Sequence, residues 1–287
     1  MPQIVSNFLG HVQNFSRFFY FYSMNLLELF SQHDISILII LAIASLFAGF
    51  IDAVVGGGGL IQFPAFMILF PNSTIPTAFG TNKIAGLSGT SIAAVQYAKR
   101  VKFNWKLLSI TAVTSFVFSF IGAKLVSQIN VNILKPFIFF MLIAIAIYTF
   151  KKKDFGSIST KKLTKKKKYL YGLLLGVIIG FYDGFLGPGT GSFLVLGFVA
   201  LLGFEFLEAS AYAKVINCVT NVSALYVFIS QGNYILEIAI IMAVSNVIGS
   251  VIGSRMAILR GNAFIRQLFL FVVCIMIIRY GYDVFFS

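Results

Sequence analysis

The sequence predicts an all-α integral membrane protein made of two homologous halves. Of its 287 residues, 59% are hydrophobic and only 11% are charged, whereas soluble domains are roughly 45–50% apolar and about 25% charged. The mean hydropathy is +0.93, and several apolar runs reach the roughly 20 residues that a helix needs to cross the hydrocarbon core. Because no soluble fold could bury so much apolar surface, we expect the chain to cross the membrane many times.

About eight runs are expected to form full membrane-spanning helices. Two of them, residues 77–98 and 208–229, are more polar, and we expect other helices to shelter them. The six strongly apolar runs are residues 35–55, 106–127, 131–150, 169–186, 235–257 and 263–285. Two shorter segments, residues 60–71 and 192–203, each cover about 18 Å at the helical rise of about 1.5 Å per residue. The core is roughly 30 Å thick, so these segments are predicted to be half-helices.

A constant offset of 131 residues relates the two halves. At this offset, residue types that are rare in this chain coincide: Gly49 with Gly180, Asp52 with Asp183, Gly56 with Gly187, Lys83 with Lys214, and Gly122 with Gly253. The register holds without a gap, and charged residues and glycines rarely keep one offset by chance. The sequence therefore predicts an internal duplication.

The duplication divides the chain into four parts. Residues 1–34 form an aromatic N-terminal segment, in which residues 8–30 are expected to lie as a helix at the membrane interface. Residues 35–150 form the first transmembrane repeat, residues 151–168 a lysine-rich loop, and residues 169–287 the second repeat.

The net charge of +13 does not indicate nucleic-acid binding, because nine of the 22 basic residues lie in the loop at 151–168. Positive loops remain in the cytoplasm, beside anionic lipid headgroups. The same rule favours inverted over parallel halves, because inversion also places the basic loops at 99–106 and 255–266 inside. We therefore expect a multi-pass membrane protein whose basic loops lie in the cytoplasm.

A glycine-rich break follows the first helix of each half. The first break reads GFIDAVVGGGG at residues 49–59, and the second reads GFYDGFLGPGTG at residues 180–191. Glycine lets the backbone leave helical geometry, and Pro188 removes a hydrogen-bond donor. Unwound backbone survives in a membrane only if it is buried in protein or faces a watery cavity. The breaks are therefore expected to line a cavity.

The half-helices after the breaks would direct amide groups at that cavity, which is a suitable arrangement for binding an anion. The backbone expected to bind it comprises Gly56, Gly57, Gly58, Gly59, Gly187, Gly189, Thr190 and Gly191. The glycines could instead permit close helix packing, although four in a row exceed what packing requires. A nucleotide-binding loop is not expected, because no lysine followed by serine or threonine comes after either break.

Two lysines and two aspartates lie inside the predicted spans. Lys83 and Lys214 occupy matched positions on the two polar helices, and Lys83 lies roughly 10 Å along its helix from Pro76. An intramembrane charge costs at least about 2.5–3.5 kcal/mol, which favours a functional role. The lysines either bind a substrate anion, or reach the interface or pair with Asp52 and Asp183. Anion binding and pairing can alternate if a lysine leaves its aspartate for the substrate and the released aspartate takes a proton. This makes the two aspartates candidates for proton coupling.

Three amides beside the lysines, Asn82, Asn217 and Asn221, complete the candidate binding residues. They could line a permeation path or bond between helices. No catalytic residue, metal ligand or cofactor is predicted. His11 and His33 both lie in the N-terminal segment, and no cluster of histidine, aspartate and glutamate occurs elsewhere, so an intramembrane enzyme is disfavoured.

These motifs resemble the sulfite exporter TauE/SafE family, in its broad bacterial branch of membrane transporters. The resemblance covers residue 35 to the C-terminus and rests on GFIDAVVGGGGLIQFP (49–64), GTNKIAG (80–86), GFYDGFLGPGTGS (180–192), AKVINCVTN (213–221) and GNAFIRQ (261–267). It implies a secondary carrier for sulfur-containing anions such as sulfite, sulfonates and sulfoacetate. The aromatic N-terminal segment and the lysine loop depart from the family pattern.

Together these features predict alternating access, in which two halves rock around a central anion site. An anion channel with the same lining stays open as an alternative. The expected partners are a small anion and the lipid bilayer, without nucleic acid, and the oligomeric state does not follow from the sequence.

Overall fold

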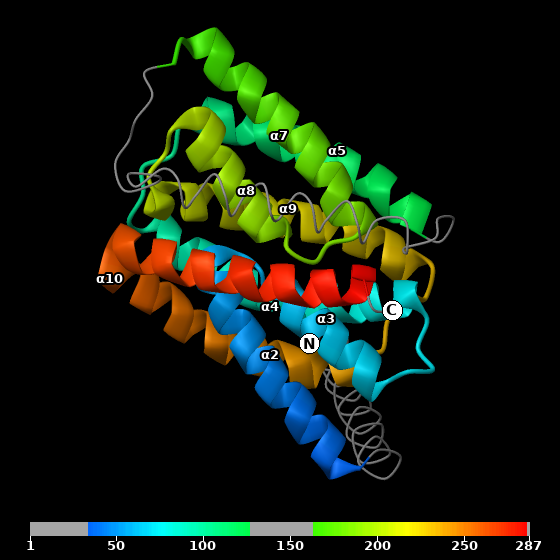
Figure 1. The fold of residues 1–287 in the computed structure, drawn as a ribbon. Helices are drawn as coiled ribbons and strands as arrows, with labels where there is room; N and C mark the ends of the chain where they lie inside the picture. The colour runs from blue at the N-terminus through cyan, green and yellow to red at the C-terminus, as the bar shows by residue number, and fades with distance from the viewer. Residues whose placement is uncertain (1–33, 127–162, 286–287) are drawn as a thin grey trace, which may run out of the picture. The chain divides into compact units, whose positions relative to one another are not determined.

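A computed structural model describes residues 34–126 and 163–285, and within these ranges the regular structure is entirely helical (Figure 1). This confirms the all-α architecture for that part of the chain. The predicted helix at 8–30, the predicted span at 131–150 and most of the lysine loop lie outside the described residues. The helices are α2 (Ile35–Val55), α3 (Gly59–Leu69), α4 (Ile75–Ala98), α5 (Trp105–Leu125), α7 (Lys165–Phe185), α8 (Thr190–Gly197), the π-helix η3 (Phe198–Leu202), α9 (Phe206–Ser230) and α10 (Leu236–Phe285).

Residues 41–287 form one compact unit, which contains every candidate site residue, and residues 1–40 form a separate unit. The described part of the smaller unit is the beginning of α2. There the Ser36 amide donates to Asp34 Oδ1 over 3.0 Å. This bond caps the helix, whose first amides have no intrahelical acceptor.

Four of the described helices are long and apolar enough to cross a membrane: α2, α5, α9 and the Leu236–Val272 part of α10. Large apolar side chains such as Phe47, Ile178 and Val244 are exposed on them and on α7, as expected of side chains that face lipid. Within its most apolar window, α9 is 61% buried, against 39% for the other three. The predicted sheltering of this polar helix is thus confirmed, and the protein is a multi-pass membrane protein.

Two short apolar helices follow the glycine breaks, as the sequence predicts. α3 has 11 residues, and α8 has eight before it passes into η3. Gly203, with a φ of 75°, ends η3 in the left-handed region. Both half-helices begin a residue or two earlier than expected, because Gly59 and Thr190 already adopt helical geometry.

The two predicted helices at 235–257 and 263–285 form the single element α10, which is interrupted only at Gly261 within its length. Gly261 has a φ of 69° and a ψ of −161°, which is not helical. A residue with a Cβ rarely adopts this conformation. The chain therefore changes direction at the point where the sequence predicts a connection between two helices.

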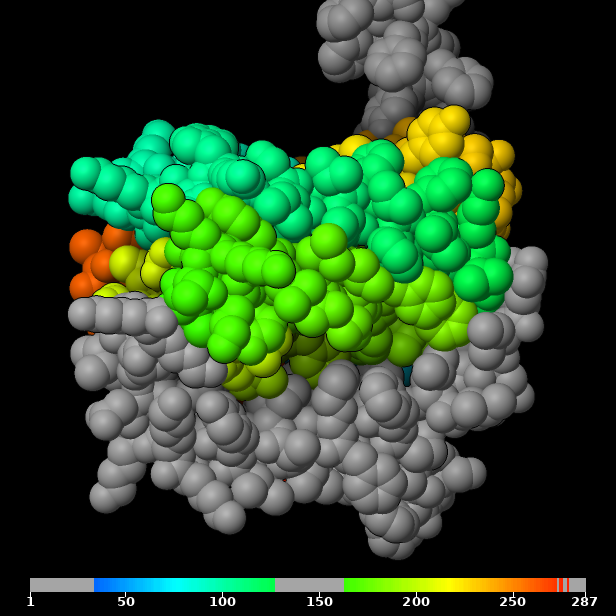
Figure 2. Space-filling view, turned by 90° about the horizontal axis from the view of Figure 1, so that it is seen from above, coloured from blue at the N-terminus to red at the C-terminus, as the bar shows by residue number. Residues whose placement is uncertain are grey.

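The closest helix packing joins segments from different predicted halves. α7 carries a glycine at every fourth position along the face that meets α5, and Figure 2 shows α7 lying directly against α5. A Cβ on any of these glycines would collide with α5 atoms: Gly172, Gly176, Gly180 and Gly184. Small residues at this spacing let membrane helices approach until their backbones touch.

α2 meets α10 in a matching way. Gly49 packs against the Asn246 backbone, and Gly253 packs against the Phe50 carbonyl. Adding or subtracting 131 residues converts these contacts into Gly180 against Ser115 and Gly122 against the Phe181 carbonyl, which the structure also contains. The first long helix of each predicted half therefore packs against a helix of the other half.

Candidate functional site

The two glycine breaks share a left-handed glycine just after the first helix, but they differ before the half-helix, where Gly58 has a φ of −56° and the matched Gly189 has a φ of 88°. α2 ends at Val55 and is followed by Gly56 with a φ of 72°, whereas α7 ends at Phe185 and is followed two residues later by Gly187 with a φ of 82°. Gly56 and Gly187 occupy matched positions at the 131-residue offset. The left-handed conformation ends each helix and turns the chain toward its half-helix.

The two breaks touch each other through their backbones. A Cβ on Gly191 would lie 2.5 Å from Gly56 Cα. This distance is too short for any side chain to fit at Gly191. The Ser192 hydroxyl donates to the Val55 carbonyl over 3.1 Å and also to the Gly56 carbonyl. Segments about 130 residues apart in the chain are thus held together at the centre of the larger unit.

Two buried ion pairs lie beside the breaks, and each joins a lysine of one predicted half to an aspartate of the other. Lys83 Nζ lies 2.9 Å from Asp183 Oδ2, and Lys214 Nζ lies 3.1 Å from Asp52 Oδ2. The sequence left open whether the lysines pair with the aspartates, and the structure contains both pairs. Lys83 is 5% exposed and Lys214 is 0% exposed, so neither lysine reaches the interface.

The carbonyls that end α2 accept hydrogen bonds from other helices. The last carbonyls of a helix have no intrahelical donor. Here hydroxyl groups from α4, α8 and α9 each donate a hydrogen bond to one of three such carbonyls. These bonds run from Tyr97 to the Ala53 carbonyl (3.0 Å), from Ser210 to the Val54 carbonyl (3.4 Å), and from Ser192 to the Val55 carbonyl (3.1 Å). Lys214 Nζ also donates to the Asp52 carbonyl. The first break is therefore fixed at successive residues.

The second break lacks this set of donors. In the described ranges, no side chain donates to the carbonyls of Gly184, Phe185 or Leu186. The reason lies in the sequence, because the three hydroxyl donors correspond to apolar residues at the 131-residue offset: Tyr97 to Phe228, Ser192 to Ile61, and Ser210 to Phe79. Different side chains hold the second break: Tyr182 donates to the Pro188 carbonyl and Thr190 to the Gly187 carbonyl, each over 2.7 Å.

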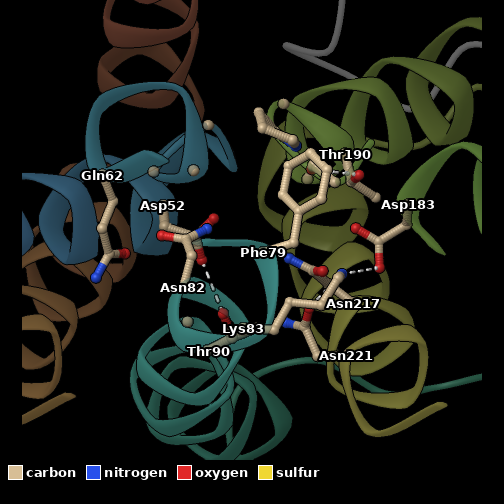
Figure 3. A pocket seen from close by; sticks show the side chains of 18 of the residues that line it. Asp52, Gln62, Phe79, Asn82, Lys83, Thr90, Asp183, Thr190, Asn217 and Asn221 are labelled. Atoms are coloured by element: carbon tan, nitrogen blue, oxygen red, sulfur yellow. Dashed lines mark hydrogen bonds and ion pairs between the residues drawn. The ribbon is translucent and has the colours of Figure 1, made fainter. Parts of the chain in front are cut away.

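A polar cavity of about 50 Å³ lies between the breaks, with room for a small ion or a few water molecules. Figure 3 shows Asp52 and Asp183 on opposite sides of this cavity, with the Phe79 ring between them. Phe79 stacks on Phe63 at 4.5 Å between ring centroids, which fixes its position. The cavity is therefore small, buried and lined by polar groups from both predicted halves.

The amides around the cavity are not all hydrogen-bonded. Asn221 Oδ1 accepts from Lys83 over 3.0 Å, and Asn246 donates to Gln62 Oε1 over 3.0 Å. By contrast, Asn82 Oδ1 is buried without a hydrogen-bond partner among the residues that the structure describes. A buried unpaired polar atom costs about 1–3 kcal/mol. Asn82 is thus available to a bound molecule.

An apolar crevice of about 480 Å³ adjoins this cavity. It runs between α2, α3 and the last part of α10, where Phe47, Ile61 and Phe271 are exposed. Gly57 lines both the crevice and the polar cavity. At this point a single glycine separates the polar site from a surface that faces lipid.

A family model described as sulfite exporter TauE/SafE matches residues 41–280, a range that contains both breaks and both ion pairs. The chain belongs to the sulfite exporter TauE/SafE family. Similarity to individual proteins supports the same family. The chain is 38% identical over 245 residues to the "Probable membrane transporter protein ORF9" of a Sinorhizobium species, covering 85% of this chain and 92% of that protein.

Two further relatives carry similar names. The chain is 32% identical over 249 residues to a "Probable membrane transporter protein" of Haemophilus influenzae, covering 87% of this chain and 96% of the other. It is 32% identical over 248 residues to the "Probable membrane transporter protein YfcA" of Escherichia coli, covering 85% and 89%. No solved structure matches the chain. Membership of the TauE/SafE family thus indicates membrane transport in general.

Most residues that the TauE/SafE resemblance and the sequence single out surround the cavity. Two do not line it: Lys214, which lies behind Asp52, and Gly56, which packs against Gly191. Those that line it are Asp52, Gly57, Gly58, Gly59, Asn82, Lys83, Asp183, Gly187, Gly189, Thr190, Gly191, Asn217 and Asn221. Sequence reasoning missed Gln62, Phe79 and Asn246 as lining residues. Gln62 and Asn246 could have been predicted to line the cavity, because each is an amide in an otherwise apolar helix. No feature of the sequence distinguishes Phe79 from the other phenylalanines.

Proposed function

We propose that the protein is a secondary transporter that carries a small anion across the bacterial cytoplasmic membrane by alternating access. The observation that carries the proposal is Lys83, a buried cation that faces a polar cavity between two broken helices. The family model's description supports a sulfur-containing anion such as sulfite, a sulfonate or sulfoacetate.

Two features of the cavity favour an anion as its ligand. Lys83 offers an ammonium that donates only to side-chain oxygens, which a substrate oxygen can replace. The N-terminal ends of α3 and α8 border the cavity at Gly59 and Thr190. A helix N-terminus presents amide groups and a partial positive charge, which attract anions. Asn82 and Asn217 add amides that can orient the ligand.

Reciprocal contacts support two homologous halves, residues 35–150 and 169–287, which we infer to be inverted with the loop at 151–168 in the cytoplasm. The Lys83–Asp183 and Lys214–Asp52 pairs exchange when 131 residues are added or subtracted. So do the bonds from Ser119 to the Thr220 carbonyl (3.0 Å) and from Ser250 to the Gly89 carbonyl (2.6 Å). Carriers that work by alternating access place such repeats around a central site.

Proton coupling through the aspartates fits the same arrangement. An anion that takes a lysine releases the partner carboxylate, and a buried unpaired carboxylate is costly unless it binds a proton. Asp52 and Asp183 are therefore the candidate coupling groups.

Flux into proteoliposomes tests the proposal. The purified protein is reconstituted, and uptake of radiolabelled sulfite, methanesulfonate and an uncharged solute is compared in wild type and Lys83→Gln. We expect saturable uptake of at least one anion, a loss of more than tenfold in Lys83→Gln, and no uptake of the uncharged solute.

Other outcomes would identify a different protein class. Equal flux of the uncharged solute, or no anion flux, contradicts the anion carrier. Currents in planar bilayers far above the turnover of a carrier would instead support an anion channel.

A further inference from the structure

The charges around the cavity sum to zero. Among the described residues that line the cavity or pair with a lining residue, the charged ones are Lys83, Lys214, Asp52 and Asp183. An anion that enters this balanced site leaves one uncompensated negative charge in a buried place. Such a charge is unstable in a medium of low dielectric constant. The site therefore needs a positive charge to accompany the anion.

The Lys83–Asp183 pair is built so that it can open. Among the described residues, Lys83 Nζ donates only to two side-chain oxygens, Asp183 Oδ2 at 2.9 Å and Asn221 Oδ1 at 3.0 Å. Lys83 and Asp183 both line the cavity, and Asp183 is 1% exposed. Within the described ranges the Asp183 carboxylate has no donor other than Lys83. If an anion takes Lys83, Asp183 is left buried and unpaired.

The Lys214–Asp52 pair is built so that it stays closed. Lys214 does not line the cavity, and its ammonium holds both the Asp52 carboxylate and the Asp52 main-chain carbonyl. Thr90 donates a second hydrogen bond to Asp52 Oδ2 over 2.9 Å. Opening this pair would disturb the backbone of the first break, which the hydroxyl donors also fix. Asp52 therefore keeps its partners when substrate binds.

We propose that the two ion pairs have different roles, so that Asp183 binds the coupling proton and the Lys214–Asp52 pair acts as a positioning element for the first break. This inference rests on the proposed anion transport and names its coupling ion. The substrate anion replaces the Asp183 carboxylate on Lys83 Nζ, and the freed carboxylate takes one proton from the adjoining solution. The pair carries no net charge before the exchange or after it, and release reverses both events.

Among the described residues, Lys83 is the charged group that contacts Asp183, and Asp52, across the same cavity, is held by Lys214. Lys83 approaches from α4, and α9 contributes Asn221, with Lys214 bound to Asp52. α5 presents Ser119 and Gly122 to this part of α7, and α8 has no charged residue. In the described part of the chain, Asp183 is thus the one carboxylate whose sole charged partner faces the substrate.

Proton movement with a strong-acid anion tests the inference. Methanesulfonate has no proton of its own at neutral pH, so a proton that enters with it is carried by the protein. Proteoliposomes with an internal pH dye report protons per methanesulfonate or per sulfite, the latter corrected for the protons that sulfite itself binds. At zero membrane potential, one proton per anion means that an interior more alkaline by one pH unit raises steady-state accumulation about tenfold.

Three variants test which aspartate carries the proton. The quantity measured is the steady-state ratio of internal to external anion, which depends neither on the transport rate nor on the orientation of the protein. Asp183→Asn is expected to lose the tenfold response and Asp183→Glu to restore it, whereas the double variant Asp52→Asn/Lys214→Gln, which removes the other ion pair and keeps the net charge at zero, is expected to keep it. A response that persists in Asp183→Asn, or that is lost in the Asp52→Asn/Lys214→Gln double variant, overturns the assignment.

The wild-type protein also tests the inference without any variant. If it carries either anion without a proton, the inference fails and the proposed transport stands. If it carries neither anion, both fail. If Asp183→Asn moves no anion, one proton per anion in wild type together with a tenfold response in both Asp183→Glu and the Asp52→Asn/Lys214→Gln double variant supports the assignment, and any other result overturns it.

Discussion

Replacing Gly191 by alanine is expected to push the two glycine breaks apart. The new Cβ would lie 2.5 Å from Gly56 Cα, and the colliding atom belongs to the backbone, so no side chain can rotate away. Overpacking of this kind costs about 1–3 kcal/mol. Gly56→Ala meets the same contact from the other side, and its φ of 72° adds about 1–2 kcal/mol, because a Cβ clashes in the left-handed region. We therefore expect Gly56→Ala to be the more destabilising variant.

Two glycines elsewhere in the chain provide matched controls. Gly232 has a φ of 69° with no atom within 4 Å of an added Cβ, so Gly232→Ala isolates the conformational term. Gly86 lies inside α4 and lines the cavity, where an added Cβ has open space, so Gly86→Ala serves as a control for stability alone and should be neutral or stabilising by up to about 1 kcal/mol.

Thermal unfolding in detergent, followed by circular dichroism, measures the series. One kcal/mol shifts the midpoint by roughly 2–4 °C in proteins of about 150–250 residues, so Gly191→Ala should lower it by about 2–12 °C. A Gly191→Ala midpoint equal to that of Gly86→Ala would refute the backbone contact between the breaks.

Three further predictions follow from the contacts around the cavity. Lys214→Met should lower the unfolding midpoint more than Lys83→Met, because Lys214 also holds the Asp52 carbonyl; equal midpoints in the same assay would contradict this. Tyr97→Phe leaves the Ala53 carbonyl unpaired, at about 1–3 kcal/mol, and should speed hydrogen exchange at residues 53–59 but not at 184–191. Asn82→Ala removes no hydrogen bond within the described chain and removes a buried unpaired oxygen, so it should raise the KM of anion flux without lowering the unfolding midpoint; an unchanged KM would exclude Asn82 from the site.

The sequence predicts the breaks and the half-helices because their signals are costly residues in an apolar chain. A lysine, an aspartate or four consecutive glycines inside a membrane span needs a reason, and the 131-residue offset doubles each signal. The two apolar runs of α10 were also separable, because Gly261 lies between them. The glycines at every fourth position of α7 are likewise typical of a packing face in a membrane helix.

Other features of the site depend on distances that the sequence does not contain. The offset matches Lys83 with Lys214, but it does not say which aspartate each lysine meets, and the pairs prove to cross between the halves. The position of Phe79 beside the cavity follows from its stacking on Phe63, which no local pattern predicts. The unequal support of the breaks emerges only when Tyr97 and Phe228 are compared in their places.

The position of Gly57 bears on how the membrane voltage acts on this protein. Gly57 alone stands between the polar cavity and the lipid-facing crevice at that point, so electrical insulation reaches almost to the ion pairs. An unbalanced charge there would be poorly screened, and moving it across the full membrane would change its energy by about 2.3 kcal/mol per 100 mV. A monovalent anion that crosses together with a proton moves no net charge, and its turnover at a fixed pH difference should therefore be the same with and without a membrane voltage.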